Sequence, residues 1–147
     1  MIRKRVLVVD DEPSVRELLG YLLDTFGHAW ETACDADQAL GMLEHTPFDL
    51  VLTDFKMPGM NGVELAHEIK KRKKGMRVVL ITGEQPQNLT KDIDWVLLKP
   101  IVVQELRETI DLFARKRRSP QGCSADGQYD TPQPALPPGA TKRLPPS

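Results

Sequence analysis

The feature that most constrains the fold is an alternation of short, continuous apolar runs with amphipathic helical patterns. Strands buried on both faces of a parallel sheet lack the polar–apolar alternation of half-exposed strands, so continuous apolar runs are typical of them. Such runs occupy residues 6–9, 50–52, 78–81 and 95–98, and residues 29–32 form a weaker candidate. Strand–helix alternation implies right-handed crossovers. The sequence therefore predicts an α/β fold with a doubly wound parallel sheet.

Four segments carry the spacing of helices with one buried face. Pro13 suits the first turn of the first helix. Asp35 and Gln38 resemble a capping box that opens the second helix, and Asn61 can cap the third. The predicted buried faces are, in chain order, Val15, Leu18, Leu19, Leu22, Leu23 and Phe26; Ala36, Ala39, Leu40 and Leu43; Val63, Ala66 and Ile69; and Val103, Leu106, Ile110 and Phe113.

Two segments depart from this alternation. The interval from Thr82 to Lys99 has room for a turn at residues 85–88 and little more than one helical turn at residues 89–93. The fourth crossover helix is therefore predicted to be shortened or missing. Residues 119–147 hold seven of the twelve prolines and few large apolar residues, a composition that cannot offset the entropy cost of ordering. We predict one folded domain at residues 1–118 and a proline-rich disordered tail at residues 119–147.

Composition and charge argue against several classes of protein. A formal net charge of −1 is not that of a general nucleic-acid binder. No apolar run approaches the ~20 residues of a membrane span, and the run after the basic N-terminus is too short for a signal peptide. Cys34 and Cys123 form no metal or redox spacing. We expect a cytoplasmic protein that binds neither membrane nor nucleic acid directly.

Two basic runs need an interpretation beside that expectation. Residues 70–74 and 115–118 each end a predicted helix, where cations interact favourably with the helix dipole. Solvated helix ends are therefore favoured over nucleic-acid contacts. The segment after residue 118 is too short and too proline-rich for a DNA-binding domain.

Polar residues stand where the predicted strands end. Open α/β sheets bind ligands at the carboxyl ends of their strands. Carboxylates about 4 Å apart repel by several kcal/mol at an effective dielectric near 20, and Mg²⁺, which prefers oxygen ligands, offsets that repulsion. A lysine at the same edge adds a positive charge, and a threonine adds a hydroxyl donor. A crevice for a metal-bound phosphoryl group is predicted from Asp10, Asp11, Asp54, Thr82 and Lys99.

Each of these signals has a plainer interpretation when taken alone. Acidic residues after a strand are common at helix N-termini, and an aspartate such as Asp54 suits a turn. Lys99 before Pro100 can simply end a strand. Their joint occurrence, in order, at the ends of the predicted strands favours phosphoryl chemistry.

The chain resembles the response regulator receiver family over about residues 4–116. The matching motifs are VVDDEP at residues 8–13, VLTDFKMPGMNG at residues 51–62, Thr82-Gly83 and Lys99-Pro100. The resemblance implies a flavodoxin-like, five-stranded sheet of strand order 2-1-3-4-5. It also implies that Asp54 accepts a phosphoryl group from a phosphohistidine of a histidine kinase or histidine phosphotransfer protein, in a two-component or phosphorelay system.

The resemblance further implies a role for the neighbouring residues. Asp11 and Asp54 would bind Mg²⁺ directly, together with the backbone carbonyl of Lys56, and Asp10 would act partly through water. The protein would catalyse its own phosphorylation and dephosphorylation, but it would act mainly as a switch on an unknown downstream protein.

On the phosphate side, the resemblance implies that Thr82 and Lys99 bind phosphoryl oxygens. The peptide bond before Pro100 would be cis and would place Lys99. Phosphoryl transfer needs mainly positioning and charge neutralisation, and a carboxylate such as Asp54 is a nucleophile that forms acyl phosphates.

Two departures from the family concern its switch. Receivers usually carry Tyr or Phe three residues before the lysine, but this chain has Val96 there, with Trp95 beside it and expected to face the other side of the sheet. Valine cannot act as a rotating aromatic switch, and Trp95 can equally be packed against a helix. The short interval between residues 82 and 99 also removes much of the helix that usually forms the output and dimerisation face.

Two residues flank the acceptor, and in the family these positions tune hydrolysis of the acyl phosphate. Lys56 lies two residues after Asp54, and Glu84 lies two residues after Thr82. One hypothesis is that Lys56 and Glu84 pair across the crevice and prolong the phosphorylated state. The alternative is two solvated side chains with little effect.

Other functions remain open at this point. A degenerate receiver would bind its partner constitutively, without a phosphorylation switch; Val96 and the short interval favour it. A flavodoxin-like nucleotide binder would need a Ser-, Thr- or Gly-rich loop after the first strand, where this chain is acidic. An aspartate-nucleophile phosphatase would need an acid at position 56, where this chain has lysine.

Overall fold

The computed structural model describes residues 3–85 and 89–114. Its core is a parallel sheet of five strands in the order β2-β1-β3-β4-β5. Each predicted apolar run is a strand, and the implied strand order is confirmed. The strands are β1 (Arg5–Val9), β2 (Ala29–Ala33), β3 (Leu50–Asp54), β4 (Arg77–Thr82) and β5 (Trp95–Leu98).

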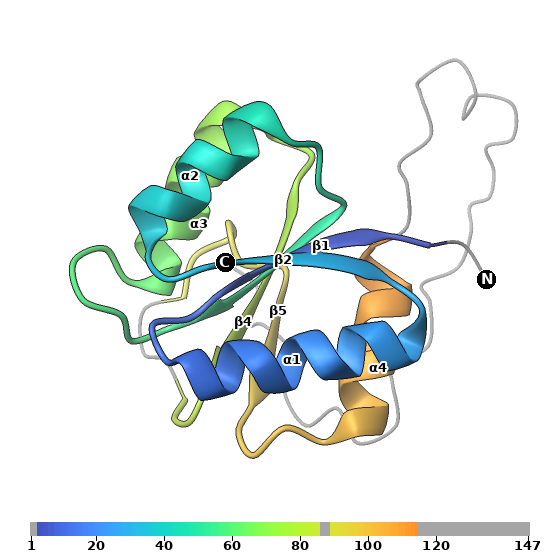
Figure 1. Ribbon diagram of the computed structural model, residues 1–147. Coiled ribbons are helices and arrows are strands. Elements are labelled where there is room, and N and C mark those ends of the chain that lie inside the picture. The colour runs from blue at the N-terminus through green and yellow to red at the C-terminus, as the bar shows by residue number, and fades with distance from the viewer. Residues whose placement is uncertain (1–2, 86–88, 115–147) are drawn as a thin grey trace, which may run out of the picture.

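Helices cover both faces of this sheet (Figure 1). α1 (Pro13–Phe26) and α4 (Val103–Phe113) lie on one face, and α2 (Ala36–His45) and α3 (Gly62–Arg72) lie on the other. The buried side chains accordingly form two clusters, one on each side of the strands. Such a doubly wound sheet is the architecture that the sequence predicts.

The predicted helix starts are found, with one change. Pro13 is the first residue of α1, and Asn61 and Glu64 form a complete capping box at α3. At α2 the Asp35 side chain accepts a hydrogen bond from the Gln38 N–H, but the Gln38 side chain accepts from the Cys34 N–H, not from Asp35. The capping box predicted for α2 is therefore only half formed.

Two residues predicted to be buried are not. Leu18 and Val103 are both 49% exposed. Leu18 lies beside, not within, the stripe of α1 that contacts the sheet. Val103 is the first residue of α4, and because helical side chains tilt toward the N-terminus, it projects past the start of the helix.

The connection from β4 to β5 contains no helix in its described residues, 83–85 and 89–94, as predicted. Ile93 is buried and Leu89 packs against the same core. Asp94 accepts a 2.8 Å hydrogen bond from the Val78 N–H and lies 3.0 Å from Lys70 Nζ of α3. Side-chain contacts thus hold this short connection to the sheet and to α3.

Some predictions fall outside the described residues. These are most of the turn at residues 85–88, the basic run at 115–118, the domain boundary at 118 and the disordered tail at 119–147. In the described part of the chain, none of the helices has the length and apolar character needed to cross a bilayer.

Candidate functional site

Strand pairing brings the carboxyl ends of the central strands to one edge of the sheet. In the parallel register, Asp54 lies opposite Ile81 and Thr82 lies opposite Leu98. The Lys99 N–H continues this ladder with a 2.8 Å hydrogen bond to the Thr82 carbonyl. Buried apolar strands therefore deliver the predicted polar residues to a common edge.

Three carboxylates meet at this edge. Oxygen atoms of Asp10, Asp11 and Asp54 all lie within 4.8 Å of one another. Asp10 is only 3% exposed, and its Oδ1 accepts a 2.9 Å hydrogen bond from the Glu12 N–H. Burial, with a smaller contribution from the charge of Asp54, raises the pKa of Asp10 to about 6, although the Glu12 N–H opposes that shift. The cluster therefore carries negative charge that the fold only partly offsets.

These residues fit a hard divalent cation. Carboxylate oxygens are the ligands that Mg²⁺ prefers, and a cation among them would favour the charged form of Asp10, whose pKa is raised mainly by burial and to a smaller extent by the neighbouring carboxylates. The donor set thus matches the metal that the sequence predicts.

Asp54 is held in a defined orientation at the end of β3. Its Oδ1 accepts a 2.9 Å hydrogen bond from the Phe55 N–H and lies 3.4 Å from Lys99 Nζ. No hydrogen bond reaches Oδ2 from the residues that the structure describes. The peptide bond between Lys99 and Pro100 is cis. One carboxylate oxygen is therefore anchored, and the other accepts no hydrogen bond from the described residues.

Thr82 and Glu84 are linked through the backbone. Thr82 is buried, and its hydroxyl donates a 3.0 Å hydrogen bond to the Glu84 carbonyl and accepts a 3.3 Å bond from the Glu84 N–H. The hydroxyl has a single proton, so it would have to give up its bond to the Glu84 carbonyl before it could donate to another acceptor. This turn was not predicted from the sequence, although threonine hydroxyls commonly bond the backbone two residues onward.

Lys56 and Glu84 form an ion pair at the mouth of the site, with 2.6 Å between Nζ and Oε2. The hydrogen bond to Glu84 raises the pKa of Lys56. Both side chains are exposed, at 74% and 57%, so the pair is open to solvent.

Two contacts that shape the site were missed at the level of sequence. Arg16 of α1 donates a 2.7 Å hydrogen bond to the Asp10 carbonyl, which ties α1 to the acidic cluster. Gly62 lies so close to β3 that a Cβ atom there would collide with the Asp54 carbonyl and with Leu80. The sequence gives no signal for the Arg16 contact. For the close approach of Gly62, the only signal is that a glycine follows Asn61.

Val96 and Trp95 point to opposite faces of the sheet. Val96 belongs to the cluster beneath α2 and α3, and Trp95 belongs to the cluster beneath α1 and α4. The Trp95 ring packs against Phe113 of α4, with 5.5 Å between the ring centroids. Trp95 is therefore a packed core residue, and position 96 offers no aromatic ring.

Comparisons with known proteins point to one family. A family model for the response regulator receiver domain matches residues 6–111. The sensor histidine kinase RcsC of Salmonella typhi is 34% identical over 118 residues, which cover 77% of this chain and 12% of RcsC. The chain thus spans about an eighth of the length of that relative.

Solved structures agree with the family model. The response regulator protein TrrA of Thermotoga maritima, crystallised with Mg²⁺ and BeF, is 37% identical, with a TM-score of 0.70 over 74% of this chain and 96% of TrrA. TrrA in complex with the histidine kinase ThkA is also similar, with 37% identity and a TM-score of 0.67 over 74% and 96% of the two chains.

Proposed function

This chain belongs to the response regulator receiver family of two-component systems, and from that premise we propose that it is switched by phosphorylation of Asp54. One observation carries the proposal. The carboxylates of Asp10, Asp11 and Asp54 cluster within 4.8 Å while Lys99 Nζ lies 3.4 Å from Asp54 Oδ1, so one site combines a metal-binding group, a nucleophile and a fixed cation.

In this proposal Asp54 is the nucleophile. Oδ2 attacks the phosphorus of a phosphohistidine, so that an O–P bond forms while the N–P bond breaks and its electron pair stays on the imidazole. The Phe55 N–H and Lys99 hold Oδ1 during this step and keep the carboxylate oriented. Positioning and neutralisation of charge are what phosphoryl transfer needs most.

Asp11, Asp54 and the backbone carbonyl of Lys56 are the proposed direct ligands of Mg²⁺, with Asp10 acting partly through water. When bound there, Mg²⁺ supplies positive charge that offsets the charge of the transferred phosphoryl group. The similarity to TrrA, which was crystallised with Mg²⁺ and BeF, supports this assignment.

Thr82 and Lys99 are the proposed ligands of the phosphoryl oxygens. To donate to them, the Thr82 hydroxyl gives up its hydrogen bond to the Glu84 carbonyl. That bond helps to close the first turn of the β4–β5 connection, so phosphorylation loosens this segment directly. Such a route needs no aromatic ring at position 96.

Lys56 and Glu84 are proposed to set the lifetime of the phosphorylated state. Their ion pair spans the mouth of the site between the loop after β3 and the loop after β4. Held there, the two side chains restrict the approach of water opposite the Asp54–phosphorus bond.

The proposed phosphodonor is a histidine kinase or a histidine phosphotransfer protein. The similarity to TrrA in its complex with ThkA supports this class of partner. Exposed apolar side chains are present on helices that begin at the same edge as the acidic cluster: Leu18 and Tyr21 on α1, and Val102 and Val103 at the start of α4. They offer apolar surface to a docking partner.

A second candidate is a degenerate receiver that binds its partner without switching. The buried Val96 favours it, as does the lack of a helix in the described residues between β4 and β5. Beryllofluoride, which mimics a phosphoryl group on aspartate, separates the two candidates. The switch predicts a bound ¹⁹F NMR signal that requires both Mg²⁺ and Asp54, with a change in tryptophan fluorescence. A folded protein that gives no such signal at saturating Mg²⁺ is a degenerate receiver.

A further inference from the structure

A groove of about 570 Å³ runs between α3 and the β4–β5 connection. Its floor is partly apolar, since Met60 and Val63 pack against the core beneath it. Its walls are polar and mainly acidic, formed by Glu64, His67, Glu68 and Asp92. The small pocket between α2 and α3, of about 20 Å³, is by contrast no larger than a water site.

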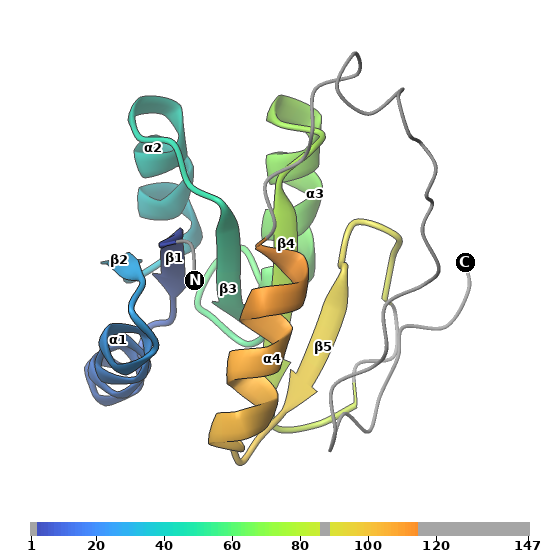
Figure 2. The ribbon, with the colours of Figure 1, turned by 90° about the vertical axis from the view of Figure 1, so that its right-hand side faces the viewer.

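The groove lies beside α3, at the position that a helix between β4 and β5 would occupy. α1, α2 and α3 each connect two strands, whereas the described residues between β4 and β5 form no helix. This connection lies against α3, held by His67 Nδ1 at 3.1 Å from Asp92 Oδ2 and by Lys70 Nζ at 3.0 Å from Asp94 Oδ2. In Figures 1 and 2, α3 is the last described helix on its face of the sheet, and β5 lies beyond it. Within residues 3–85 and 89–114, one side of α3 therefore has no helical neighbour.

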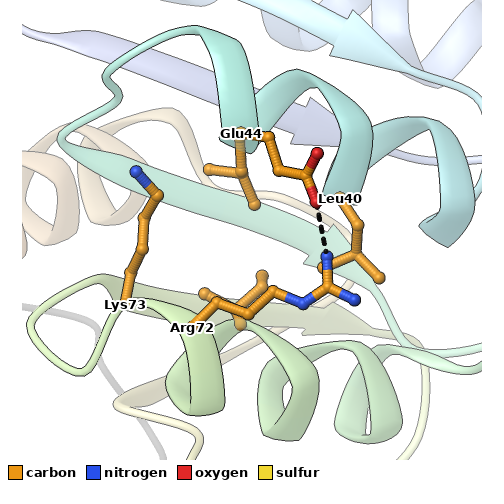
Figure 3. Close-up of a pocket in the computed structure, with 6 residues that line it drawn as sticks. Leu40, Glu44, Arg72 and Lys73 are labelled. Carbon is orange, nitrogen blue, oxygen red and sulfur yellow. Dashed lines mark hydrogen bonds and ion pairs between the residues drawn. The ribbon is translucent and has the colours of Figure 1, made fainter.

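On the exposed side of α3, acidic residues lie in the N-terminal part of the helix and a basic residue lies near its C-terminal end. Glu64 and Lys71 are seven residues apart, about two helical turns, so they lie on the same side of the helix with His67 between them. Arg72 pairs with Glu44 of α2 at 3.3 Å (Figure 3), and its Nη2 also lies 3.9 Å from Glu68 Oε1. Lys71 is 59% exposed and reaches Glu68 at 3.4 Å, and an exposed pair of this kind exchanges partners easily.

This pattern is self-complementary. Consider two α3 helices that lie antiparallel about a two-fold axis passing between residues 67 and 68. Every contact then occurs twice, because if residue i of one helix contacts residue j of the other, residue j of the first also contacts residue i of the second. Glu64 then faces Lys71 of the partner subunit, and His67 faces Glu68 of the partner subunit. The opposite charges of Glu64 and Lys71 are thereby paired on both sides of the axis, and each His67 ring is brought to a carboxylate.

We propose that the exposed side of α3, together with the mouth of this groove, is an interface with a second copy of the chain, in which two α3 helices lie antiparallel. Met60 and Val63 supply the apolar part of the contact. Exposed ion pairs contribute little each, and salt screens them, so the dimer is weak, reversible and sensitive to ionic strength.

The interface also adjoins the phosphorylation site. Gly59 and Met60 line the groove and belong to the loop that connects Asp54 to α3. Any link between dimerisation and signalling rests on the proposed function. The dimer itself does not, so its test uses unphosphorylated protein without Mg²⁺.

Sedimentation equilibrium of the full chain tests the proposal. We expect concentration-dependent dimerisation in about 20 mM salt, and at least tenfold weaker association in about 500 mM salt. Lys71→Glu and Glu64→Lys should each weaken the dimer tenfold or more, because each places like charges opposite one another. An equimolar mixture of the two variants should restore the dimer, because both pairs are then attractive.

Two further variants keep the test decisive. Glu17→Lys makes the same charge change on the exposed surface of α1 and should leave association unchanged. Because Glu64 also belongs to the α3 capping box, Glu64→Gln, which keeps an acceptor for the Asn61 N–H, should weaken the dimer without loss of helix in circular dichroism. A chain that stays monomeric at about 1 mM, a dimer that Lys71→Glu leaves unchanged, or folded variants that do not recover on mixing would overturn the proposal.

Discussion

At the scale of single residues, Asp10 shows a conflict between folding and function. It is buried beside two other carboxylates, and its pKa is raised from 3.8 to about 6. Because the folded state holds the proton more tightly than the unfolded state, the stability of the metal-free protein falls as pH rises from about 4 through 6. The charged form of Asp10 therefore lowers the stability of the metal-free protein at neutral pH.

Asp10→Asn should therefore stabilise the metal-free protein at neutral pH, by about 1–3 kcal/mol, because the buried charge is removed while an acceptor for the Glu12 N–H is kept. The same change should weaken Mg²⁺ binding. Thermal unfolding in a chelator measures the first effect, and titration calorimetry with Mg²⁺ measures the second. Asp37→Asn, at an exposed position of α2, is the matched control; an Asp10→Asn variant less stable than the parent would contradict the account.

Lys56→Ala and Glu84→Ala should each speed the loss of phosphate from Asp54 by a few-fold, because either change breaks the ion pair that shields the bond from water. The double variant should be no faster than the quicker single variant, since both act through one pair. Decay of the phosphorylated protein after removal of the phosphodonor gives the rate. Unchanged rates would show that the two side chains are merely solvated.

At the scale of elements, the sequence predicts those features of the strands and helices that depend on residues close together in the chain. Continuous apolar runs predicted four of the five strands, a weaker candidate predicted β2, and the polar ends of the strands predicted which residues meet at the sheet edge. Leu18 and Val103 were assigned to the core in error because spacing alone does not define the edges of a buried stripe. The contacts of Asp94 with Lys70 and Val78 were not foreseen, since they join residues distant in sequence.

Within the site, the positions of the side chains could be predicted from the sequence, but their hydrogen bonds could not. The strand ends place Asp54, Thr82 and Lys99 together because parallel strands align their carboxyl ends. The bonds of the Thr82 hydroxyl to the Glu84 backbone depend on one side-chain rotamer and on the path of the following loop. Threonine has a general preference for such bonds, but the sequence does not show which rotamer and which loop path are adopted.

Packing between α1 and β2 depends on a glycine in the middle of α1. A Cβ atom at Gly20 would lie 2.5 Å from the Trp30 ring, whereas nothing lies within 4 Å of one at Gly41 of α2. Gly20→Ala should destabilise the protein by about 1–3 kcal/mol, despite the gain in helix propensity. Gly41→Ala should stabilise it by about 0.5–1 kcal/mol. Urea unfolding of both variants checks this, and the same sign for both would contradict it.

At the scale of the whole molecule, stability depends on pH through a second buried group. His28 is 3% exposed, and its Nδ1 accepts a 3.1 Å hydrogen bond from the Lys4 N–H. Burial lowers its pKa below 6.5; the cations Lys4, Arg3 and Arg107 act in the same direction, and Asp111 opposes them. The neutral form is therefore favoured in the folded state, and the stability it contributes is lost as pH falls below about 6.5.

Asp10 and His28 change the free energy of unfolding with pH in opposite directions. The contribution of His28 is therefore best measured in the Asp10→Asn background. There, the free energy of unfolding should fall between pH 7.5 and 5.5. His28→Asn, which keeps an acceptor near the Nδ1 position, should flatten that dependence. Urea unfolding at the two pH values gives the comparison, and a slope that His28→Asn leaves intact would assign it to another group.

Phosphorylation of Asp54 is the claim on which the functional account depends, and intact-mass spectrometry tests it most directly. Incubated with Mg²⁺ and acetyl phosphate, the protein should gain the mass of one phosphoryl group, and it should not do so with a chelator present or as Asp54→Asn. A folded protein that gains no phosphoryl group, or one in which Asp54→Asn is still modified, would contradict the account.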